Sequence, residues 1–297
     1  MFPDPLPALP PLADDSHKGD RGRVLLIAGS SGMAGAVALA ATAALRSGAG
    51  YVEIVCPASL LASLTEAVPA AMVHVCGSSS CEQLEAAHIP IMLEYAARAQ
   101  SVVIGPGLGA VPSEVWLPQL LAELQKQLPA LPLLLDADGL NHLAAAHALS
   151  TCTANMILTP HPGEAARLLD LPSSAAVQKN RSAIAQVLSE ASQAVIVLKG
   201  AGTWVAQQGH PQWQNHSGNV GLATAGSGDV LSGHIGALLA GGLSPFEAAR
   251  LGVYLHGTAA DSFAEEWGPD GLTAMDLPLW ISKEMKTWRE NPVESSQ

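Results

Sequence analysis

The amino-acid sequence predicts an α/β protein with a largely parallel central sheet that is covered by helices on both faces. Short, continuous apolar runs such as RVLLIAG (23–29) and AVIVLKG (194–200) alternate with helical segments. Strands that are apolar on both faces are typical of parallel sheets buried between helices. From Gly226 onward the pattern changes to helices alone. No fixed repeat and no linker-like stretch interrupts this pattern, so we expect one domain.

The expected elements follow the chain in order. The first 15 residues hold five prolines, which predicts an extended N-terminal arm (1–15) before a single domain at 16–290 and a frayed tail at 291–297. SPFE (244–247) is a capping box with proline at the first helical position. Apolar runs predict strands at 23–29, 51–57, 70–75, 101–105, 131–138, 154–159 and 194–200, and helices are expected at 34–50, 59–68, 229–243, 244–267 and 273–288.

Composition excludes several functional classes. The chain has 297 residues, of which 48% are hydrophobic and 13% charged, so it forms a packed globular protein. Its net charge of −12 argues against nucleic acid or an anionic membrane as the main partner. No apolar run is long enough to span a membrane, and the N-terminus lacks the order of a signal peptide. The four cysteines form no C-x-x-C pair, which favours reduced thiols and a cytoplasmic location.

The segment AGSGD (225–229) is the first candidate for chemistry. Gly226 and Gly228 allow a tight turn and a close approach to a ligand, and the helix that follows directs its N–H groups and positive dipole end at that ligand. Asp229 is the only carboxylate between Thr203 and Pro245. Two interpretations stay open for it from the residues alone: an N-cap of the helix or a catalytic acid–base group.

Three further segments end predicted strands. In KGAGT (199–203) small residues let a nucleotide lie against the backbone and Lys199 offers a cation for phosphate; the alternative is a glycine hairpin with a solvated lysine. His161, in TPHPGE, lies where open α/β sheets bind ligands, although a lone histidine is more often a structural hydrogen-bonding group than a catalytic one. Asp136 and Asp138 point to opposite faces and make a poor two-carboxylate metal site, so a structural role or an indirect Mg²⁺ contact is expected.

Glycine turns at 27–35 and 103–109 are predicted to lie at the same sheet edge. Neither has the spacing of a dinucleotide-binding fingerprint. The sequence contains no P-loop, and it has no H-E-x-x-H or G-x-S-x-G motif either. These absences exclude P-loop chemistry and remove the common zinc and serine hydrolase interpretations.

Taken together, these segments resemble one family. SHKGDRGRVLLIAGS, VIGPGLG, LLLDADGLN, LTPHPGEAARLL, VLKGAGT and TAGSGDVLSG occur in the order found in ADP-dependent NAD(P)H-hydrate dehydratases of the ribokinase-like superfamily. The resemblance spans about residue 16 to the end of the chain. It implies a ribokinase-like fold and a repair reaction in which the S epimer of NADH or NADPH hydrate is dehydrated while ADP becomes AMP and phosphate.

The resemblance also implies roles for individual residues. Asp229 corresponds to the general base that takes the proton of the ring hydroxyl as this hydroxyl attacks the terminal phosphate of ADP. The nucleotide-binding residues are then Lys199, Gly200, Ala201, Gly202, Thr203, Gly226 and Gly228, with the N–H groups of 226–228 forming the anion hole. The hydrate-binding residues are Ala40, Gly107 and His161, together with Asp229.

Other expectations rest on the same resemblance. Mg²⁺ is expected to bridge the phosphate oxygens of ADP, mostly through water, and no protein ligand for it follows from the sequence. The family implies a homotetramer. Many family members carry an epimerase domain before the dehydratase, whereas here only the proline-rich arm precedes the motifs, so a separate NAD(P)H-hydrate epimerase is the expected functional partner.

Two other functions share part of this pattern. A small-molecule kinase of the same superfamily, acting for example on a vitamin precursor, would use the same Asp229 and anion hole but would take ATP and release a stable phosphate ester. A nucleotide-binding sensor would bind ADP without turnover. The HPGE and KGAGT segments favour the dehydratase over the kinase, and the intact acid of GSGD favours an enzyme over the sensor.

Overall fold

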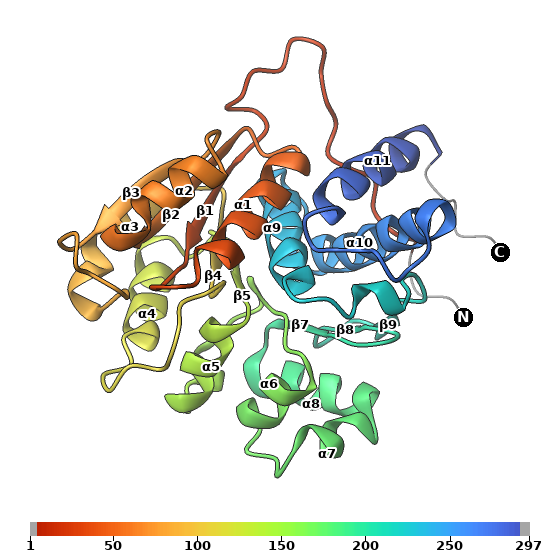
Figure 1. The fold of residues 1–297 in the computed structure, drawn as a ribbon. Coiled ribbons are helices and arrows are strands. Elements are labelled where there is room, and N and C mark those ends of the chain that lie inside the picture. The colour runs from red at the N-terminus through yellow and green to blue at the C-terminus, as the bar shows by residue number, and fades with distance from the viewer. Residues whose placement is uncertain (1–4, 292–297) are drawn as a thin grey trace.

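A single mixed sheet forms the centre of the molecule (Figure 1). The computed structural model describes residues 5–291. Within them, nine strands run in the order β3-β2-β1-β4-β5-β6-β7-β8-β9, parallel from β3 to β7 and antiparallel for β8 and β9. The largely parallel sheet is therefore confirmed. The strands are β1 Arg23–Ile27, β2 Tyr51–Pro57, β3 Met72–Cys76, β4 Ser101–Ile104, β5 Leu133–Leu135, β6 Met156–Leu158, β7 Val195–Leu198, β8 Trp204–Ala206 and β9 Trp213–Gln214.

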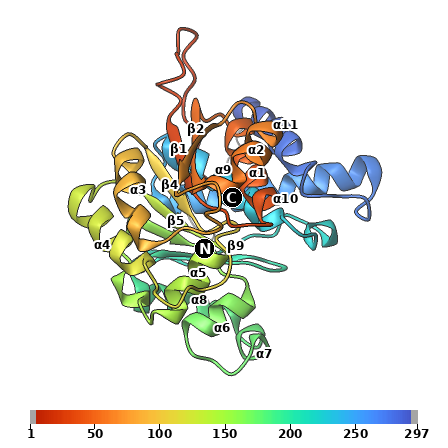
Figure 2. The same ribbon diagram turned by 60° about the vertical axis from the view of Figure 1, so that its left-hand side comes forward.

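Helices cover both faces of the sheet, as predicted (Figures 1 and 2). One face carries α1 Ala34–Arg46, α2 Leu61–Ala67, α9 Ser227–Ala240, α10 Pro245–Trp267 and α11 Leu277–Glu290. The other carries α3 Ile89–Ala96, α4 Leu117–Gln127, α5 Asp138–Ala145, α6 Pro162–Leu168, α7 Ser174–Gln178 and α8 Arg181–Ser192. Short 3₁₀ turns lie at Ala58–Leu60, Ala86–His88, Leu149–Thr151 and Val220–Leu222.

Strand alternation divides the core into two main layers. Val24 and Leu26 of β1 pack with the α1/α9/α10 face, whereas Leu25 and Ile27 pack with the α3/α4/α5 face. All four side chains are completely buried. Successive side chains of a strand point to opposite faces, so a strand covered on both sides has to be apolar throughout. This requirement explains the continuous apolar runs in the sequence.

The packing of α9 against α1 and the sheet depends on glycine. A Cβ atom at Gly233 would lie 1.9 Å from the carbonyl oxygen of Ala40, and one at Gly236 would lie 2.6 Å from a methyl group of Val103. Both helical glycines therefore let the backbones approach more closely than any side chain would permit. Since α9 is held this tightly, the position of its N-terminal turn relative to the sheet is fixed.

The two ends of the described chain meet on one side of the molecule. The indole N–H of Trp288 in α11 donates to the carbonyl oxygen of Pro7 at 3.1 Å, and Leu9 is buried beside it. Residues 5–15 hold no helix or strand, but they pack on the body. The predicted tail lies outside the described residues except for Asn291. Between residues 5 and 291, none of the helices combines the length and the apolar character that crossing a membrane requires.

Candidate functional site

Side chains that could take part in catalysis or binding follow the carboxyl ends of β5, β6 and β7. The register pairs Leu135 with Leu158, so the residues that follow, Asp136 and Thr159, are neighbours. The backbone N–H of Lys199, just after β7, donates to the carbonyl oxygen of Pro160 at 2.9 Å. Parallel strands end at the same edge, where open α/β sheets bind their ligands. The site is therefore assembled by strand register.

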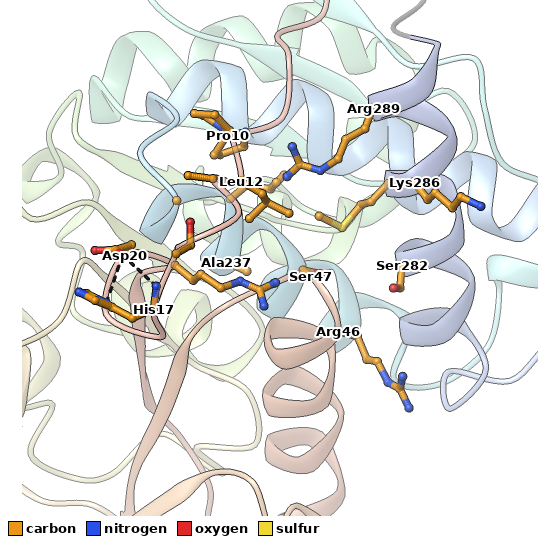
Figure 3. Close-up of a pocket in the computed structure, with 18 of the residues that line it drawn as sticks. Pro10, Leu12, His17, Asp20, Arg46, Ser47, Ala237, Ser282, Lys286 and Arg289 are labelled. Atoms are coloured by element: carbon orange, nitrogen blue, oxygen red, sulfur yellow. Dashed lines mark hydrogen bonds and ion pairs between the residues drawn. The ribbon is translucent and has the colours of Figure 1, made fainter.

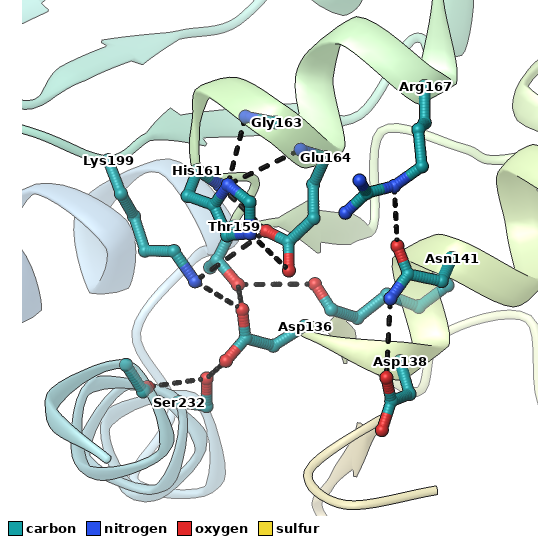
Figure 4. Close-up of polar contacts among 12 residues, drawn as sticks. Asp136, Asp138, Asn141, Thr159, His161, Gly163, Glu164, Arg167, Lys199 and Ser232 are labelled. Carbon is teal, nitrogen blue, oxygen red and sulfur yellow. Dashed lines mark hydrogen bonds and ion pairs between the residues drawn. The ribbon is translucent and has the colours of Figure 1, made fainter. Parts of the chain in front are cut away.

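Asp136 and Lys199 form a buried ion pair at this edge (Figure 4). Lys199 Nζ lies 2.6 Å from Asp136 Oδ1, which also accepts from the Thr159 hydroxyl at 2.7 Å, while the Ser232 hydroxyl donates to Oδ2 at 2.5 Å. Burial works to raise the pKa of Asp136, but Lys199 and the three hydrogen bonds outweigh it and lower that pKa. Burial likewise works to lower the pKa of Lys199, and the carboxylates around it, Asp136 foremost, raise it instead. Lys199 is thus a charged, paired group, and the alternative of a solvated hairpin lysine is wrong.

The N-terminus of α9 approaches this ion pair without a cap. Its N-cap residue is Gly226, in the left-handed conformation with φ +89°, and no side chain caps the turn. Among the described residues, the backbone N–H groups of Gly228 and Asp229 have no hydrogen-bond partner. A Cβ at Gly228 would lie 3.3 Å from Lys199 Nζ. Free N–H groups, the positive end of the helix dipole and a nearby ammonium together define an anion site.

Asp229 lies in the first turn of α9 and does not act as its N-cap, so that interpretation of the acid is wrong. Its side chain is partly buried, and its carboxylate accepts no hydrogen bond from the described residues. Burial raises the pKa of Asp229 to about 7, and the negative charge of Asp136 adds to this effect while Lys199 opposes it. A carboxyl group that titrates near neutral pH and has no structural hydrogen bond has the properties of a general base.

His161 and Glu164 cap helix α6 reciprocally. His161 Nδ1 accepts from the backbone N–H of Gly163 at 2.9 Å, and Glu164 Oε2 accepts from the backbone N–H of His161 at 2.7 Å. Burial raises the pKa of Glu164 to about 7, and its Oε2 lies 4.0 Å from Lys199 Nζ. The His161 side chain is half exposed, and burial together with Lys199 and Arg167 lowers its pKa. His161 therefore helps to cap α6, and half of its side chain stays exposed and open to a ligand.

The loop 199–203 is a shaped platform between β7 and β8. Gly200 and Gly202 have φ +137° and +65°, conformations that favour glycine. The guanidinium of Arg181, at the start of α8, donates to the carbonyl oxygens of Leu198 and Ala201 and so fixes the loop from below. Gly200 and Ala201 are exposed, so the upper surface of the loop is open to a ligand.

The two glycine turns after β1 and β4 are neighbours, as predicted. The backbone N–H of Gly29 donates to the carbonyl oxygen of Pro106 at 3.0 Å. Gly107 has φ +63°, and a Cβ there would lie 2.8 Å from the carbonyl oxygen of Met33, so only glycine fits between these loops. Ala40, in contrast, is completely buried where α1 packs on α9. The carbonyl of Ala40 faces Gly233, and a role of Ala40 in the hydrate pocket stays a prediction.

Asp136 and Asp138 have separate structural tasks. Asp138 accepts from the backbone N–H of Gly109 at 2.9 Å and from the Asn141 amide at 3.2 Å, whereas Asp136 pairs with Lys199. In the described part of the chain no group of three histidine, cysteine or acidic residues is arranged to hold a metal ion. The carboxylates of the site still outnumber its cations, which leaves room for a hydrated cation that arrives with a phosphate ligand.

Sequence reasoning missed several residues of the site. Ser232 lies three residues after Asp229 on α9, and Thr159 follows β6, so helix period and strand register could have indicated both. Arg181 and His256 had no such signal. The ring of His256, on α10, donates from Nε2 to the carbonyl oxygen of Ser227 at 3.1 Å, and burial lowers its pKa to about 4. The neutral ring of His256 thus fixes the first turn of α9 through the Ser227 carbonyl.

The fold and the site define an α/β protein of the ribokinase-like class. A ribokinase-like superfamily protein from Enterococcus faecalis has a similar structure, with a TM-score of 0.77 and 27% identity, covering 95% of this chain and 92% of that chain. The chain belongs to the NAD(P)H-hydrate dehydratase family, whose model matches residues 24–283.

Two relatives at higher identity carry names of the same kind. The ADP-dependent (S)-NAD(P)H-hydrate dehydratase of Neisseria meningitidis is 40% identical over 280 residues, covering 89% of this chain and 85% of its own length. The ADP/ATP-dependent NAD(P)H-hydrate dehydratase of Bacillus subtilis, co-crystallised with ATP and Mg²⁺, is 32% identical with a TM-score of 0.77 and 95% of each chain covered. The chain spans about half the length of other curated relatives, which are bifunctional NAD(P)H-hydrate repair enzymes.

Proposed function

We propose that this protein catalyses the ADP-dependent dehydration of the S epimer of NAD(P)H hydrate, which returns NAD(P)H and yields AMP and phosphate. The observation that carries the proposal is the uncapped N-terminus of α9, where free N–H groups, Lys199 and an unbonded Asp229 with a pKa raised to about 7 come together. The names of the Neisseria and Bacillus relatives support the same reaction. An anion site beside a general base suits phosphoryl transfer to a hydroxyl group.

The nucleotide lies, in this proposal, between the 199–203 loop and the start of α9. The exposed backbone of Gly200 and Ala201 accepts the AMP part, and the ammonium of Lys199 faces its phosphates. The free N–H groups of Gly228 and Asp229 then meet the terminal phosphoryl group. Lys199 keeps its positive charge here because Asp136 holds it protonated. The hydrate approaches from the side of His161 and Gly107.

Asp229 begins the reaction by taking the proton from the hydroxyl on C6 of the hydrated nicotinamide ring. The hydroxyl oxygen attacks the terminal phosphorus of ADP, the bond to the bridging oxygen breaks, and AMP leaves. The ring nitrogen then expels phosphate from C6, and loss of a proton from the neighbouring ring carbon completes the double bond. Water is never the leaving group, because its oxygen departs as part of the phosphate.

Mg²⁺, when it is bound, neutralises charge on the phosphate oxygens. The protein oxygens nearest the site are largely committed: Asp136 to Lys199, Thr159 and Ser232, and Glu164 to the His161 backbone. We therefore propose that Mg²⁺ would come with the phosphate ligand and would be attracted by the negative charge of Glu164 and Asp136, without direct bonds to the protein.

The test is an assay of purified protein with the S epimer of NADH hydrate and either ADP or ATP. NADH formation is followed by its near-ultraviolet absorbance, and AMP and phosphate are measured. Asp229→Asn is expected to lower turnover by about 10²–10⁴-fold, because the general base is lost. ADP affinity is expected to stay within about threefold, since the N–H groups and Lys199 remain.

The control is Asp270→Asn, which removes an exposed carboxylate that is not among the charges acting on Asp229, and it is expected to leave turnover unchanged. Near wild-type turnover in Asp229→Asn overturns the mechanism. A stable phosphate ester as product indicates the kinase, and ADP binding without any product indicates the sensor.

The remaining expectations of the family stay predictions for this chain. They are a homotetramer, a separate NAD(P)H-hydrate epimerase as functional partner and a cytoplasmic location. The preference between NADH hydrate and NADPH hydrate is measured in the same assay with both substrates.

A further inference from the structure

A cavity lies at the opposite end of the sheet from Asp229. It has a volume of about 820 Å³ and is enclosed by the N-terminal arm, the last turns of α1 and α9, and the end of α11 (Figure 3). Helices α1 and α9 begin near the candidate active site and end at this cavity. The two sites are therefore separated by the length of these helices and share no lining residue.

Basic residues gather around this cavity. Four of the 14 lysine and arginine residues of the chain line it, namely Arg21, Arg46, Lys286 and Arg289. Two acids also line it, Asp15 and Asp20, and the carboxylate of Asp20 already accepts from the backbone N–H of His17. The charge here is positive although the whole chain carries −12. A positive cavity on a negatively charged protein is the first indication of an anion site.

The arginines of the cavity are unpaired. Within residues 5–291 the guanidinium groups of Arg21, Arg46 and Arg289 make neither a hydrogen bond nor an ion pair, whereas Arg23, Arg98, Arg167 and Arg181 each bind an oxygen acceptor. Figure 3 shows Arg289 extending from α11 toward the arm at Pro10 and Leu12. Burial and the positive charge of Arg21 lower the pKa of Arg289, so the two groups lie close enough to repel each other. A bound anion would remove that repulsion.

The walls of the cavity are suited to more than a bare ion. The apolar residues Pro10, Leu12, Leu238 and Met285 also line this cavity. Volumes of about 300–1,000 Å³ are typical of pockets for small molecules and cofactors. Guanidinium forks bind phosphate oxygens in pairs, and an apolar wall accepts a planar ring or ribose.

We propose that this cavity is a second ligand site, separate from the proposed ADP site, that binds a phosphate-bearing small molecule of nucleotide size. Arg21 and Arg289 bind the phosphate groups, and the proline-rich arm forms one wall of the site. The proposal does not depend on the dehydratase reaction, because it rests on residues at the other end of the sheet.

The experiment is calorimetric titration of the whole protein with inorganic pyrophosphate and, separately, with ADP, in the absence of hydrated cofactor. The wild-type protein is expected to show a second binding component beside the one at α9. The double variant Arg21→Ala/Arg289→Ala is expected to weaken this component by at least about tenfold, because charge-assisted contacts to phosphate are lost. The binding component at the N-terminus of α9 and the KM for ADP are expected to be unchanged.

Lys126→Ala is the matched control, since Lys126 is also a basic residue in the last turn of a helix, α4, but lies outside the cavity. Equal pyrophosphate binding by the wild type and the double variant overturns the proposal, and so does an equal loss in Lys126→Ala. Size-exclusion chromatography completes the test. A change of oligomeric state in the double variant without a change in anion binding assigns the arginines to an interface and overturns the ligand site.

Discussion

Asp229 differs from other carboxylates at helix starts in having no structural hydrogen bond. Glu164 and Glu247 each accept a backbone N–H in a capping box, and both are thereby committed to their helices. Asp229 lies in the first turn of α9 behind a glycine N-cap. Its pKa is raised to about 7 by burial and by the nearby acids. The residue is therefore free to exchange a proton near neutral pH.

The activity is expected to depend on pH through this residue. Asp229 must be ionised to accept a proton, so kcat/KM is expected to rise as the pH increases through about 7 and to level off above it. The measurement is a pH profile of kcat/KM between about pH 5 and 9. Glu164 has a similar pKa, so Glu164→Gln is the control, and the inflection should persist in that variant. Loss of the inflection in Glu164→Gln would assign the titration to Glu164 instead.

The same pKa shift predicts a pH-dependent gain in stability for Asp229→Asn. The folded state binds the proton more tightly than the unfolded state, whose pKa is about 3.8, so the unfolding free energy falls as the pH rises from about 4 to about 7. Asp229→Asn has no carboxyl group at this position, so its unfolding free energy does not fall in this way. We expect it to be more stable than the wild type by roughly 1–3 kcal/mol at about pH 8, after allowance for partial exposure, and no more stable at about pH 4. Denaturant unfolding at the two pH values measures the difference, and an equal difference at both would contradict it.

Sequence reasoning went furthest where a residue's neighbours along the chain define its task. The GSGD turn, the 199–203 loop and His161 could all be proposed because each follows a predicted strand or begins a predicted helix. The pairing of Lys199 with Asp136 could not, since it joins residues 63 positions apart. The Arg181 and His256 contacts depend on how α8 and α10 pack, and helix periodicity does not say which neighbour a buried helix face meets.

At the scale of elements, α9 is positioned by close contacts at two of its glycines. Gly233 faces the Ala40 carbonyl of α1, and Gly236 faces Val103 of β4. A helix so apolar has to be buried, and the sequence predicted that much. The sequence could not show that two of the helical glycines are contact points, because it does not indicate what a glycine in a helix packs against. The strands and helices were predictable since their apolar periods are strong, whereas the ends of α1 and β1 shifted by a few residues.

Substitution of Gly233 is expected to separate α1 from α9. The new methyl group of Gly233→Ala would overlap the Ala40 carbonyl, so we expect a loss of at least about 3 kcal/mol in unfolding free energy and a fall in turnover as Asp229 moves. Gly35→Ala is the matched control, because Gly35 is also helical but a Cβ there meets nothing within 4 Å. That variant should stay within about 0.5 kcal/mol of the wild type. Chemical unfolding and the NADH assay test both, and equal effects of the two substitutions would contradict the close-contact role.

At the scale of the whole molecule, one polar cluster joins elements distant in the chain. Asp136 after β5 contacts Thr159 after β6, Lys199 after β7 and Ser232 on α9. These contacts lie between the two main apolar layers and tie the active edge of the sheet to the helix that carries Asp229. A buried ion pair contributes little net stability, but removal of one partner leaves a buried charge.

This cluster predicts a non-additive response to mutation. Asp136→Asn alone is expected to lower the unfolding free energy by about 3–5 kcal/mol, because Lys199 is left without its partner. The double variant Asp136→Asn/Lys199→Met should lose less than the sum of the two single variants. Glu94→Gln, which breaks an exposed pair with Arg98, is the control and should cost less than about 1 kcal/mol. A double-mutant cycle by denaturant unfolding checks the coupling, and simple additivity would show that the pair acts as two independent groups.

The ion pair between Lys199 and Asp136 also decides how this lysine responds to acylating metabolites. An amine attacks a thioester or an acyl phosphate only in its uncharged form, and Asp136 keeps the Lys199 ammonium protonated. Acetylation of this position would remove the charge that we propose faces the nucleotide phosphates. A lysine that could be lost to chemical damage is thus held in the one protonation state that does not react, and exposed lysines such as Lys283 and Lys286 carry that risk instead.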